Sequence, residues 1–426
     1  MYFRSASLAL SLVFHLCIIA QTKHNAASIR HWGYEAEYQL GNVMVLDKFQ
    51  RSYMKDRATW ALALKANHVS LPSDSDAYAY SYGYPTFSVV TKFCRNSHAS
   101  MYRDTDYPGG NILPVDYISH LGNSLALYGS FSIPILKNNR WEFDLSANLG
   151  IAYSSRKYDK QHNVDNDMIG ANLLFYAGGG FSATYRLTDR WGLKGGVDYW
   201  HISNGSTRQP NRSANIIGPV ASIVYYPYYE HVLAHRHDYI PEMFHRYWYL
   251  NLKMGVGIKT CIEDWDYTQY KVEFNDPDYR TEHFNLYSCC SFQADAMYRY
   301  ARIGAIGFGA DIQYGSYYKH IKDLDQKKGV QSQYSPWSLS LMAKKTFFYK
   351  NVSLALGLGI YVYRHLGDFS NRHDPFYFNR IGVHYSIPKL NGLTVGIEVK
   401  AHMTKADFTE LVVSYPIVFQ KKPKIL

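Results

Sequence analysis

Residues 141–154 read WEFDLSANLGIAYS, and every second residue is apolar. The odd positions run from Trp141 to Tyr153 through phenylalanine, leucine, alanine and isoleucine, whereas the even positions include Glu142, Asp144 and Asn148. Successive side chains of a β-strand point to opposite faces, so the pattern predicts a strand with one apolar and one polar face. At about 14 residues, this strand is longer than the usual strand of about five or six residues.

The same alternation recurs along the chain, from residues 125–133, 173–187 and 191–203 to residues 393–401 and 411–419. The face opposite the apolar one is rich in Gly, Ser, Asn, Asp and Tyr, which suits a wet interior. Tight turns at 138–139 and 188–189 alternate with long polar loops such as 156–169 and 206–213. These features predict an all-β, antiparallel transmembrane β-barrel, although the strands of a soluble β-sandwich also have one buried face.

Strand counting divides the chain into two halves. We expect about eight strands in a unit spanning residues 29–228, a connector at 229–245, and roughly six to eight strands in a second β-meander half at 246–419. Because two complete barrels in one chain are unusual, we predict a single barrel of about 14–16 strands rather than two tandem barrels. The segment GLKGGVDYWHIS, which begins at Gly192, resembles GLTVGIEVKAHM, which begins at Gly392, and the two halves are therefore candidates for a repeat.

Composition agrees with an exported membrane protein. Aromatic residues make up 16% of the chain and charged residues only 19%, a balance typical of outer-membrane barrels with aromatic girdles. Residues 1–20 combine a short basic start, an apolar run and Ala20, which predicts a cleaved signal peptide. In an exported protein, the formal net charge of +10 favours anionic lipid headgroups over nucleic acid as partners.

The cysteines form no metal-ligand pattern. Cys94, Cys261, Cys289 and Cys290 remain after the signal peptide, without a CxxC pair, and we interpret them as structural thiols. No stretch beyond the signal segment approaches the roughly 18 consecutive apolar residues of a membrane helix. Any part that spans a membrane is therefore expected to be a barrel.

One strand carries unexpected chemistry. In residues 191–204 the apolar odd face ends with His201 and Ser203. Ionisable groups are costly on a lipid-facing surface, so a functional role is the default hypothesis. Residues i and i+2 of a strand lie about 7 Å apart, close enough for an imidazole to reach a hydroxyl, and a neutral His beside a Ser can activate an oxygen nucleophile. Accidental H-x-S patterns are nevertheless common.

HISNGSTRQPN at 201–211, with GGGFSATYRLTDRWGLKGGVDYW before it, resembles the signature of the lipid A 3-O-deacylases, the PagL-type acyloxyacyl hydrolases of the Gram-negative outer membrane. The resemblance implies an eight-stranded barrel over residues 29–228 and an esterase that removes an acyl chain from the lipid A of lipopolysaccharide without a metal or other cofactor. It assigns Ser203 as the nucleophile and His201 as the general base. Asn204 and Asn211 would support the oxyanion.

The resemblance has one departure. The family acid that orients the histidine corresponds here to Asn215, whose amide can still accept an N–H bond but stabilises the imidazolium less. Arg208 and Arg212, in the same loop, could bind lipid A phosphates, or they could be solvated loop charges. The alternative function is a non-enzymatic outer-membrane barrel, a pore or lipid-binding scaffold, with a degenerate site. If the strand of His201 is the seventh, it runs outward and ends at the outer leaflet.

Overall fold

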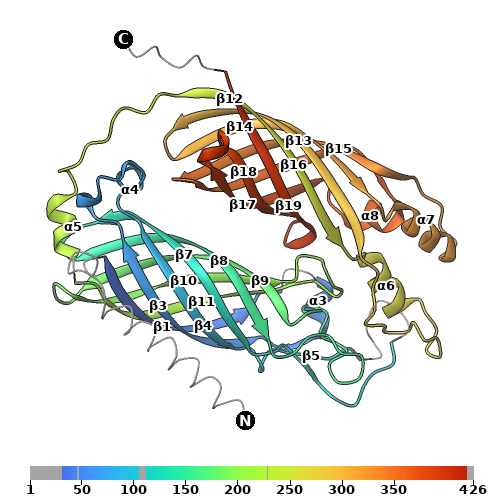
Figure 1. Cartoon of the computed structure of the whole chain (residues 1–426). Helices are drawn as coiled ribbons and strands as arrows, with labels where there is room; N and C mark the ends of the chain where they lie inside the picture. Colours follow the sequence, from blue (N-terminus) through green and yellow to red (C-terminus); the bar gives the residue numbers. More distant parts are fainter. Residues whose placement is uncertain (1–30, 46–47, 105–111, 228, 420–426) are drawn as a thin grey trace.

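The computed structural model describes residues 31–45, 48–104, 112–227 and 229–419. The predicted signal peptide lies outside these residues. The described part is built from two closed barrels that lie side by side (Figure 1). Within it, no helix is long and apolar enough to cross a membrane.

The first barrel closes in the order β1-β11-β10-β9-β8-β7-β4-β3, with neighbouring strands antiparallel. Its eight strands are β1 (Trp32–Val43), β3 (Ala58–Val69), β4 (Thr86–Arg95), β7 (Ser124–Lys137), β8 (Trp141–Ser154), β9 (Leu173–Arg186), β10 (Trp191–Ser203) and β11 (Ala214–Tyr225).

The second barrel follows a simple meander in which each strand pairs with the next and the last pairs with the first. Its eight strands are β12 (Tyr247–Lys259), β13 (Tyr287–Ala301), β14 (Gly304–Gly315), β15 (Tyr334–Tyr349), β16 (Val352–Leu366), β17 (Tyr377–Ile387), β18 (Leu393–His402) and β19 (Lys405–Val418).

The prediction of one large barrel is wrong. In the first half β11 returns to β1, where Tyr225 pairs with Tyr34, and in the second half β19 returns to β12, where Val418 pairs with Tyr249. Each half therefore closes on itself as an eight-stranded barrel. Alternating hydrophobicity reveals which face a side chain takes but not which strand lies beside it, so the sequence pattern alone could not decide the closure.

Strand β8 shows the two faces that the alternation in residues 141–154 predicts. On β8, Leu145 and Ile151 are each 50% exposed on the outside, whereas Glu142 and Asp144 are buried in the barrel interior. Outward apolar residues recur on strands of both barrels, as a lipid-facing surface requires.

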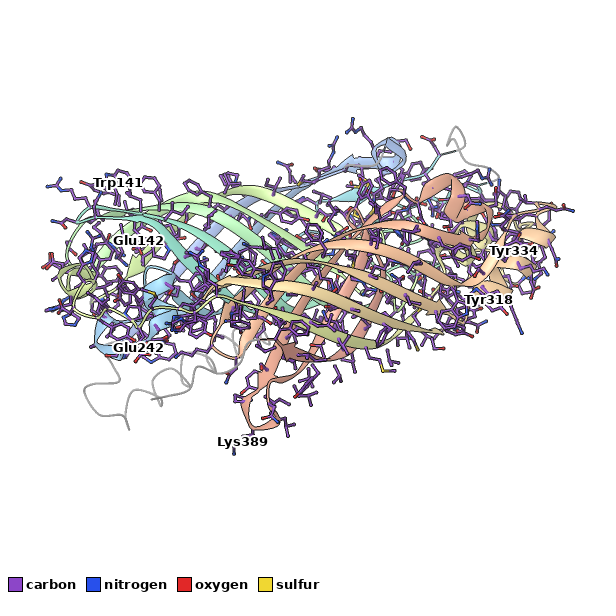
Figure 2. All side chains as sticks on the ribbon, turned by 90° about the horizontal axis from the view of Figure 1, so that it is seen from above. Trp141, Glu142, Glu242, Tyr318, Tyr334 and Lys389 are labelled. Atoms are coloured by element: carbon purple, nitrogen blue, oxygen red, sulfur yellow. The ribbon has the colours of Figure 1, made fainter. Side chains whose placement is uncertain are left out.

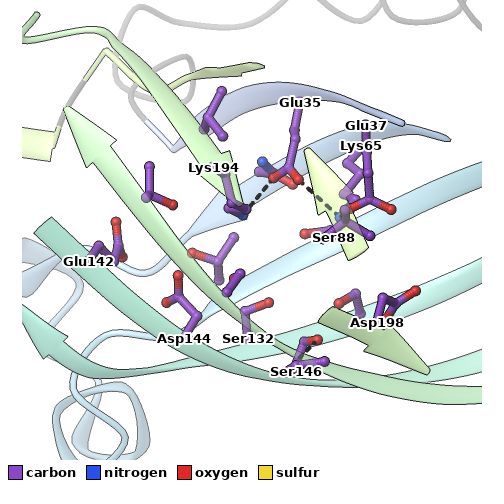
Figure 3. A pocket seen from close by; sticks show the side chains of 18 of the residues that line it. Glu35, Glu37, Lys65, Ser88, Ser132, Glu142, Asp144, Ser146, Lys194 and Asp198 are labelled. Carbon is purple, nitrogen blue, oxygen red and sulfur yellow. Dashed lines mark hydrogen bonds and ion pairs between the residues drawn. The ribbon is translucent and has the colours of Figure 1, made fainter. Parts of the chain in front are cut away.

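Ion pairs fill the interiors of both barrels. In the first barrel Lys65 bridges Glu35 and Glu37, and Lys194 lies 2.7 Å from Glu35 (Figure 3). In the second barrel Arg380 contacts Asp311, Glu398 and Glu410. An eight-stranded barrel is only wide enough for its own side chains, and these bridges cross that space.

Short elements cluster at the two ends of the molecule (Figure 1). Helices α4 (Ala77–Ser81) and α5 (Tyr229–His235) lie at the end with the tight turns, and α5 stands in the predicted connector. The end with the long loops carries most of the other short elements: α3 (Lys48–Tyr53), the small sheet of β2 (Met54–Asp56), β5 (Ser100–Met101) and β6 (Ser119–His120), and the helices α6 (Ile262–Tyr270), α7 (Tyr318–Lys327) and α8 (Gly367–His373). Two 3₁₀ turns, Pro72–Asp74 and Pro388–Leu390, complete the list. Figure 2 shows Trp141 at one extremity and Tyr318 with Tyr334 at the other.

The barrels contact each other at both ends. At the long-loop end, Trp265 of α6 packs edge-on against Tyr158 of the β8–β9 loop, with ring centroids 4.7 Å apart. At the opposite end, the Tyr349 ring of the second barrel lies 4.7 Å from Phe87 of the first. Contacts at both ends fix the orientation of the two barrels.

Candidate active site

The candidate site lies at the end of β10 that leads into the long β10–β11 loop. β10 is the seventh strand of its barrel in chain order, and it leads from a tight turn to a long loop, as the sequence predicted. Leu193 and Val197 of its odd face are exposed, whereas Asp198 and Trp200 of its even face are buried inside. His201 and Ser203 therefore continue the outward face, where neighbouring structure covers them so that Ser203 is only 5% exposed.

Three side chains form a hydrogen-bonded relay. His201 Nε2 lies 2.9 Å from Ser203 Oγ, and His201 Nδ1 lies 2.8 Å from Asn215 Oδ1. Strand pairing explains the second contact, because Asn215 on β11 is the register partner of His201. Since an amide oxygen can only accept, Nδ1 carries the hydrogen, and Nε2 offers its lone pair to the serine hydroxyl. This is the tautomer that a general base needs.

Asn215 is itself held in place. The Tyr199 hydroxyl donates to Asn215 Oδ1 at 2.7 Å, and Asn215 Nδ2 donates to Ser213 Oγ at 3.3 Å. These two bonds orient the amide so that its oxygen faces His201. Sequence reasoning missed both residues, although Tyr199 has the same strand parity as His201 and Ser203 and this shared parity is the signal that could have revealed it.

The β10–β11 loop brings the two other predicted asparagines together. The Asn204 backbone N–H donates to Asn211 Oδ1 at 3.0 Å, and Asn204 Nδ2 donates to the Arg208 carbonyl at 2.9 Å. Both asparagines are buried. Asn211 Nδ2 has no hydrogen-bond partner among the described residues. A buried donor without a partner is costly. The same amide group accepts from the backbone N–H of Asn204, the residue that follows Ser203.

The two arginines of the loop differ in their surroundings. Arg208 is exposed, whereas Arg212 forms an ion pair with Asp167 of the β8–β9 loop at 2.8 Å. Burial raises the pKa of the Asp167 carboxyl, and Arg212 opposes that rise. Arg212 is therefore engaged in holding two loops together, and Arg208 is the more accessible cation.

Family models match both halves of the chain. The model described as lipid A 3-O-deacylase (PagL) matches residues 95–223, a range that contains the whole relay. The model described as acyloxyacyl hydrolase, C-terminal domain, matches residues 247–421, the range of the second barrel. The first barrel is a PagL domain, and the second is an acyloxyacyl hydrolase C-terminal domain. Both families are ester hydrolases.

Solved structures resemble the two-domain PagL chain at low identity. The structure described as the outer membrane enzyme PagL is 16% identical, with a TM-score of 0.28, and the match covers 45% of this chain and 97% of that one. OccD3 (OpdP) of Pseudomonas aeruginosa is 9% identical, with a TM-score of 0.20 and coverage of 92% and 91%. OccK8 (OprE) of the same organism is 10% identical, with a TM-score of 0.22 and coverage of 92% and 98%.

These structural scores are low, so the family assignment rests on the two sequence models. None of the curated proteins compared with this PagL-domain chain matches it.

The C-terminal domain carries no counterpart of the relay at the equivalent strand. β18 is the seventh strand of the second barrel, as β10 is of the PagL domain, and the resemblance between the Gly192 and Gly392 segments aligns these two strands. Ala401 and Met403 occupy the positions of His201 and Ser203. His402 has the opposite parity and is buried, with its Nε2 2.7 Å from the Tyr361 hydroxyl.

Proposed function

We propose that the PagL domain is an outer-membrane esterase that removes an ester-linked acyl chain from lipid A, with Ser203 as nucleophile. The hydrogen-bonded relay Asn215–His201–Ser203 carries the proposal, because it joins a nucleophile, a base and an orienting group within 2.9 Å contacts. The family description identifies lipid A 3-O-deacylation as the activity of related domains.

The relay supports a two-step acyl transfer. Ser203 Oγ attacks the ester carbonyl while His201 Nε2 accepts its proton, and the tetrahedral intermediate then expels the sugar alkoxide, which takes that proton from the imidazolium. A water molecule, deprotonated by His201, next attacks the acyl-enzyme. This step releases the fatty acid and restores the Ser203 hydroxyl.

Asn211 is the proposed oxyanion donor. Its Nδ2 is buried and lacks a partner within the described part of the chain, whereas the Asn204 backbone N–H and side-chain Nδ2 already donate to other atoms. An oxyanion that accepts a bond from Asn211 Nδ2 would satisfy this donor in the transition state only. Loss of one such donor typically lowers kcat by about 10²–10³-fold.

The outward position of the relay suits a lipid substrate. A lipid A acyl chain lies in the hydrocarbon layer and would approach β10 from outside the barrel, and the structure that covers Ser203 has to move aside for it to reach the hydroxyl. Arg208 is exposed, and it would contact a headgroup phosphate as a charged donor. The filled interiors disfavour the alternative of a pore, since Lys92 and Asp198 form an ion pair at 2.9 Å inside the PagL domain.

Mass spectrometry of lipid A tests the proposal directly. Cells with a suitable lipid A would express the wild type, His201→Ala, Ser203→Ala, and the control Ser353→Ala on β16 of the other barrel, at matched folded levels. We expect loss of one hydroxyacyl mass with the wild type and the control, and intact lipid A with the two relay variants. Intact lipid A in all four strains would refute the esterase.

A further inference from the structure

The loop that follows Ser203 is bonded to the second barrel. Thr409 Oγ1 donates to the Gly205 carbonyl at 3.0 Å, and the Thr260 N–H and Oγ1 donate to the Ser206 carbonyl at 2.7 and 3.0 Å. In return, Gln209 Nε2 donates to the Thr260 carbonyl at 3.3 Å. Thr260 directly follows β12, and Thr409 lies on the adjacent β19. Two neighbouring strands of the second barrel therefore make all these contacts.

The residues of this seam are closely packed and almost fully buried. Ser206 is 3% exposed, Gln209 is 4% exposed and Thr260 is 1% exposed. A Cβ on Gly205 would lie 2.3 Å from Thr409 Oγ1 and 2.9 Å from the Phe175 ring, so only glycine fits between the two barrels at this point.

The bonded residues have unusual backbone conformations. Gly205 has φ +64° and Ser206 has φ +69°, in the left-handed region that residues with a Cβ rarely adopt. Ser206 therefore needs outside support to keep this conformation, and Thr260 supplies it through two bonds to its carbonyl. The same loop carries Asn204 and Asn211, which are bonded to each other.

We propose that Thr260 and Thr409 are positioning residues for the esterase site, so that the C-terminal barrel completes the active site of the PagL domain. Their hydroxyls act through the loop backbone on Asn211, the proposed oxyanion donor, and they do not touch the reacting atoms. This inference rests on the proposed esterase function.

Other contacts keep the barrels together when the seam is altered. Arg103 Nη1 donates to the Tyr270 hydroxyl at 3.2 Å, and Asp76 of the first barrel forms an ion pair with Lys350 of the second at 2.8 Å. Loss of the threonine hydroxyls is therefore expected to loosen the loop without separating the barrels. The effect should fall on kcat, because oxyanion stabilisation is expressed only in the transition state.

The test is steady-state kinetics of the full-length protein in detergent, with purified lipid A as substrate. Thr260→Val/Thr409→Val removes two hydroxyl donors and should lower kcat by about tenfold, with KM unchanged within about twofold. Thr260→Ser/Thr409→Ser keeps the donors and should retain wild-type kcat. Thr394→Val is the matched control, because its hydroxyl bonds to the Gly392 carbonyl at the other end of the barrel. Heat-modifiable migration verifies the fold of each variant.

Limited trypsin digestion reports on the loop without relying on activity. Arg208 is exposed in this loop, and cleavage after it should be faster in the double valine variant than in the wild type, the serine variant or Thr394→Val. Wild-type kcat together with wild-type cleavage in the double valine variant would overturn the proposal. An equal loss of kcat in the double serine variant would overturn it too.

Failure of the esterase assignment has a different signature. If the wild type and Ser203→Ala both leave lipid A intact, the proposed function falls and the positioning of a catalytic loop falls with it. Trypsin protection by Thr260 and Thr409 would then remain only as a structural contact.

Discussion

Tyr199 has a contact that makes a quantitative prediction about the relay. Its hydroxyl donates to Asn215 Oδ1 at 2.7 Å, and the same oxygen accepts from His201 Nδ1. Tyr199→Phe removes the hydroxyl and leaves the ring, so the outward face of β10 keeps its shape. Apart from His201 itself, the amide of Asn215 then keeps only the longer bond to Ser213 among the side-chain contacts described above.

The expected magnitude follows from a single neutral hydrogen bond. Such a bond contributes about 0.5–1.5 kcal/mol, which corresponds to a loss of roughly two- to thirteenfold in kcat. KM should not change, because Tyr199 acts through Asn215 on the base. Its contribution is therefore the same in the free enzyme and in the enzyme–substrate complex.

A double-mutant cycle with Asn215→Ala makes the assay specific. Initial rates of fatty acid release would be measured for the wild type, both single variants and the double variant. Once Asn215 is gone, Tyr199→Phe should have no further effect on kcat. Tyr385→Phe on β17, an exposed tyrosine of the other barrel, is the matched control and should match the wild type.

Two results would refute the reasoning. If Tyr199→Phe has the kcat of the wild type, the hydroxyl does not orient Asn215. If Tyr199→Phe lowers kcat by the same factor with and without Asn215, the two residues act independently, and the Tyr199 hydroxyl does not act through Asn215.

Three further predictions follow from other contacts. Asn215→Asp keeps both acceptor contacts and adds a charge that stabilises the imidazolium, so kcat should rise by up to about tenfold in the same assay, and a fall would contradict the orienting role. Arg103→Met leaves the buried Asp165 carboxylate, 2.7 Å from Arg103 Nε, unpaired and should lower the free energy of unfolding in detergent by about 3–5 kcal/mol, whereas an unchanged urea midpoint would contradict a paired charge. The bond to Asp264 at 2.5 Å raises the pKa of His320, so this pair stabilises the folded protein fully below the ordinary histidine pKa of about 6.5. The stabilisation is lost as pH rises through the raised pKa of the folded state. The difference in Tm between the wild type and His320→Gln should therefore shrink as pH rises, and a difference that grows with pH would contradict the pairing.

The outer face of β10 could be predicted from the sequence because strand geometry is local. Alternation alone puts His201 and Ser203 on one face two residues apart, and this spacing permits the observed hydrogen bond. Tyr199 shares that parity and could have been found by the same rule. Ser213 could not, because its contact with Asn215 depends on the left-handed turn at residue 213 that ends the loop.

The sequence by itself determined the alternating strands, their two faces and the placement of His201 and Ser203 on one face of β10, because each depends on a period of two or on near neighbours in the chain, whereas Asn215 was identified by the family resemblance. Only the tertiary structure decided that two barrels form, since closure depends on the pairing of β1 with β11 and of β12 with β19, residues far apart in sequence. The same holds for the seam between Ser206 and Thr260, which a chain pattern cannot reveal because its partners belong to separately closed barrels. Hydrogen bonds between distant backbone groups leave no periodic trace in the sequence, and so the support of the proposed catalytic loop became visible only in three dimensions.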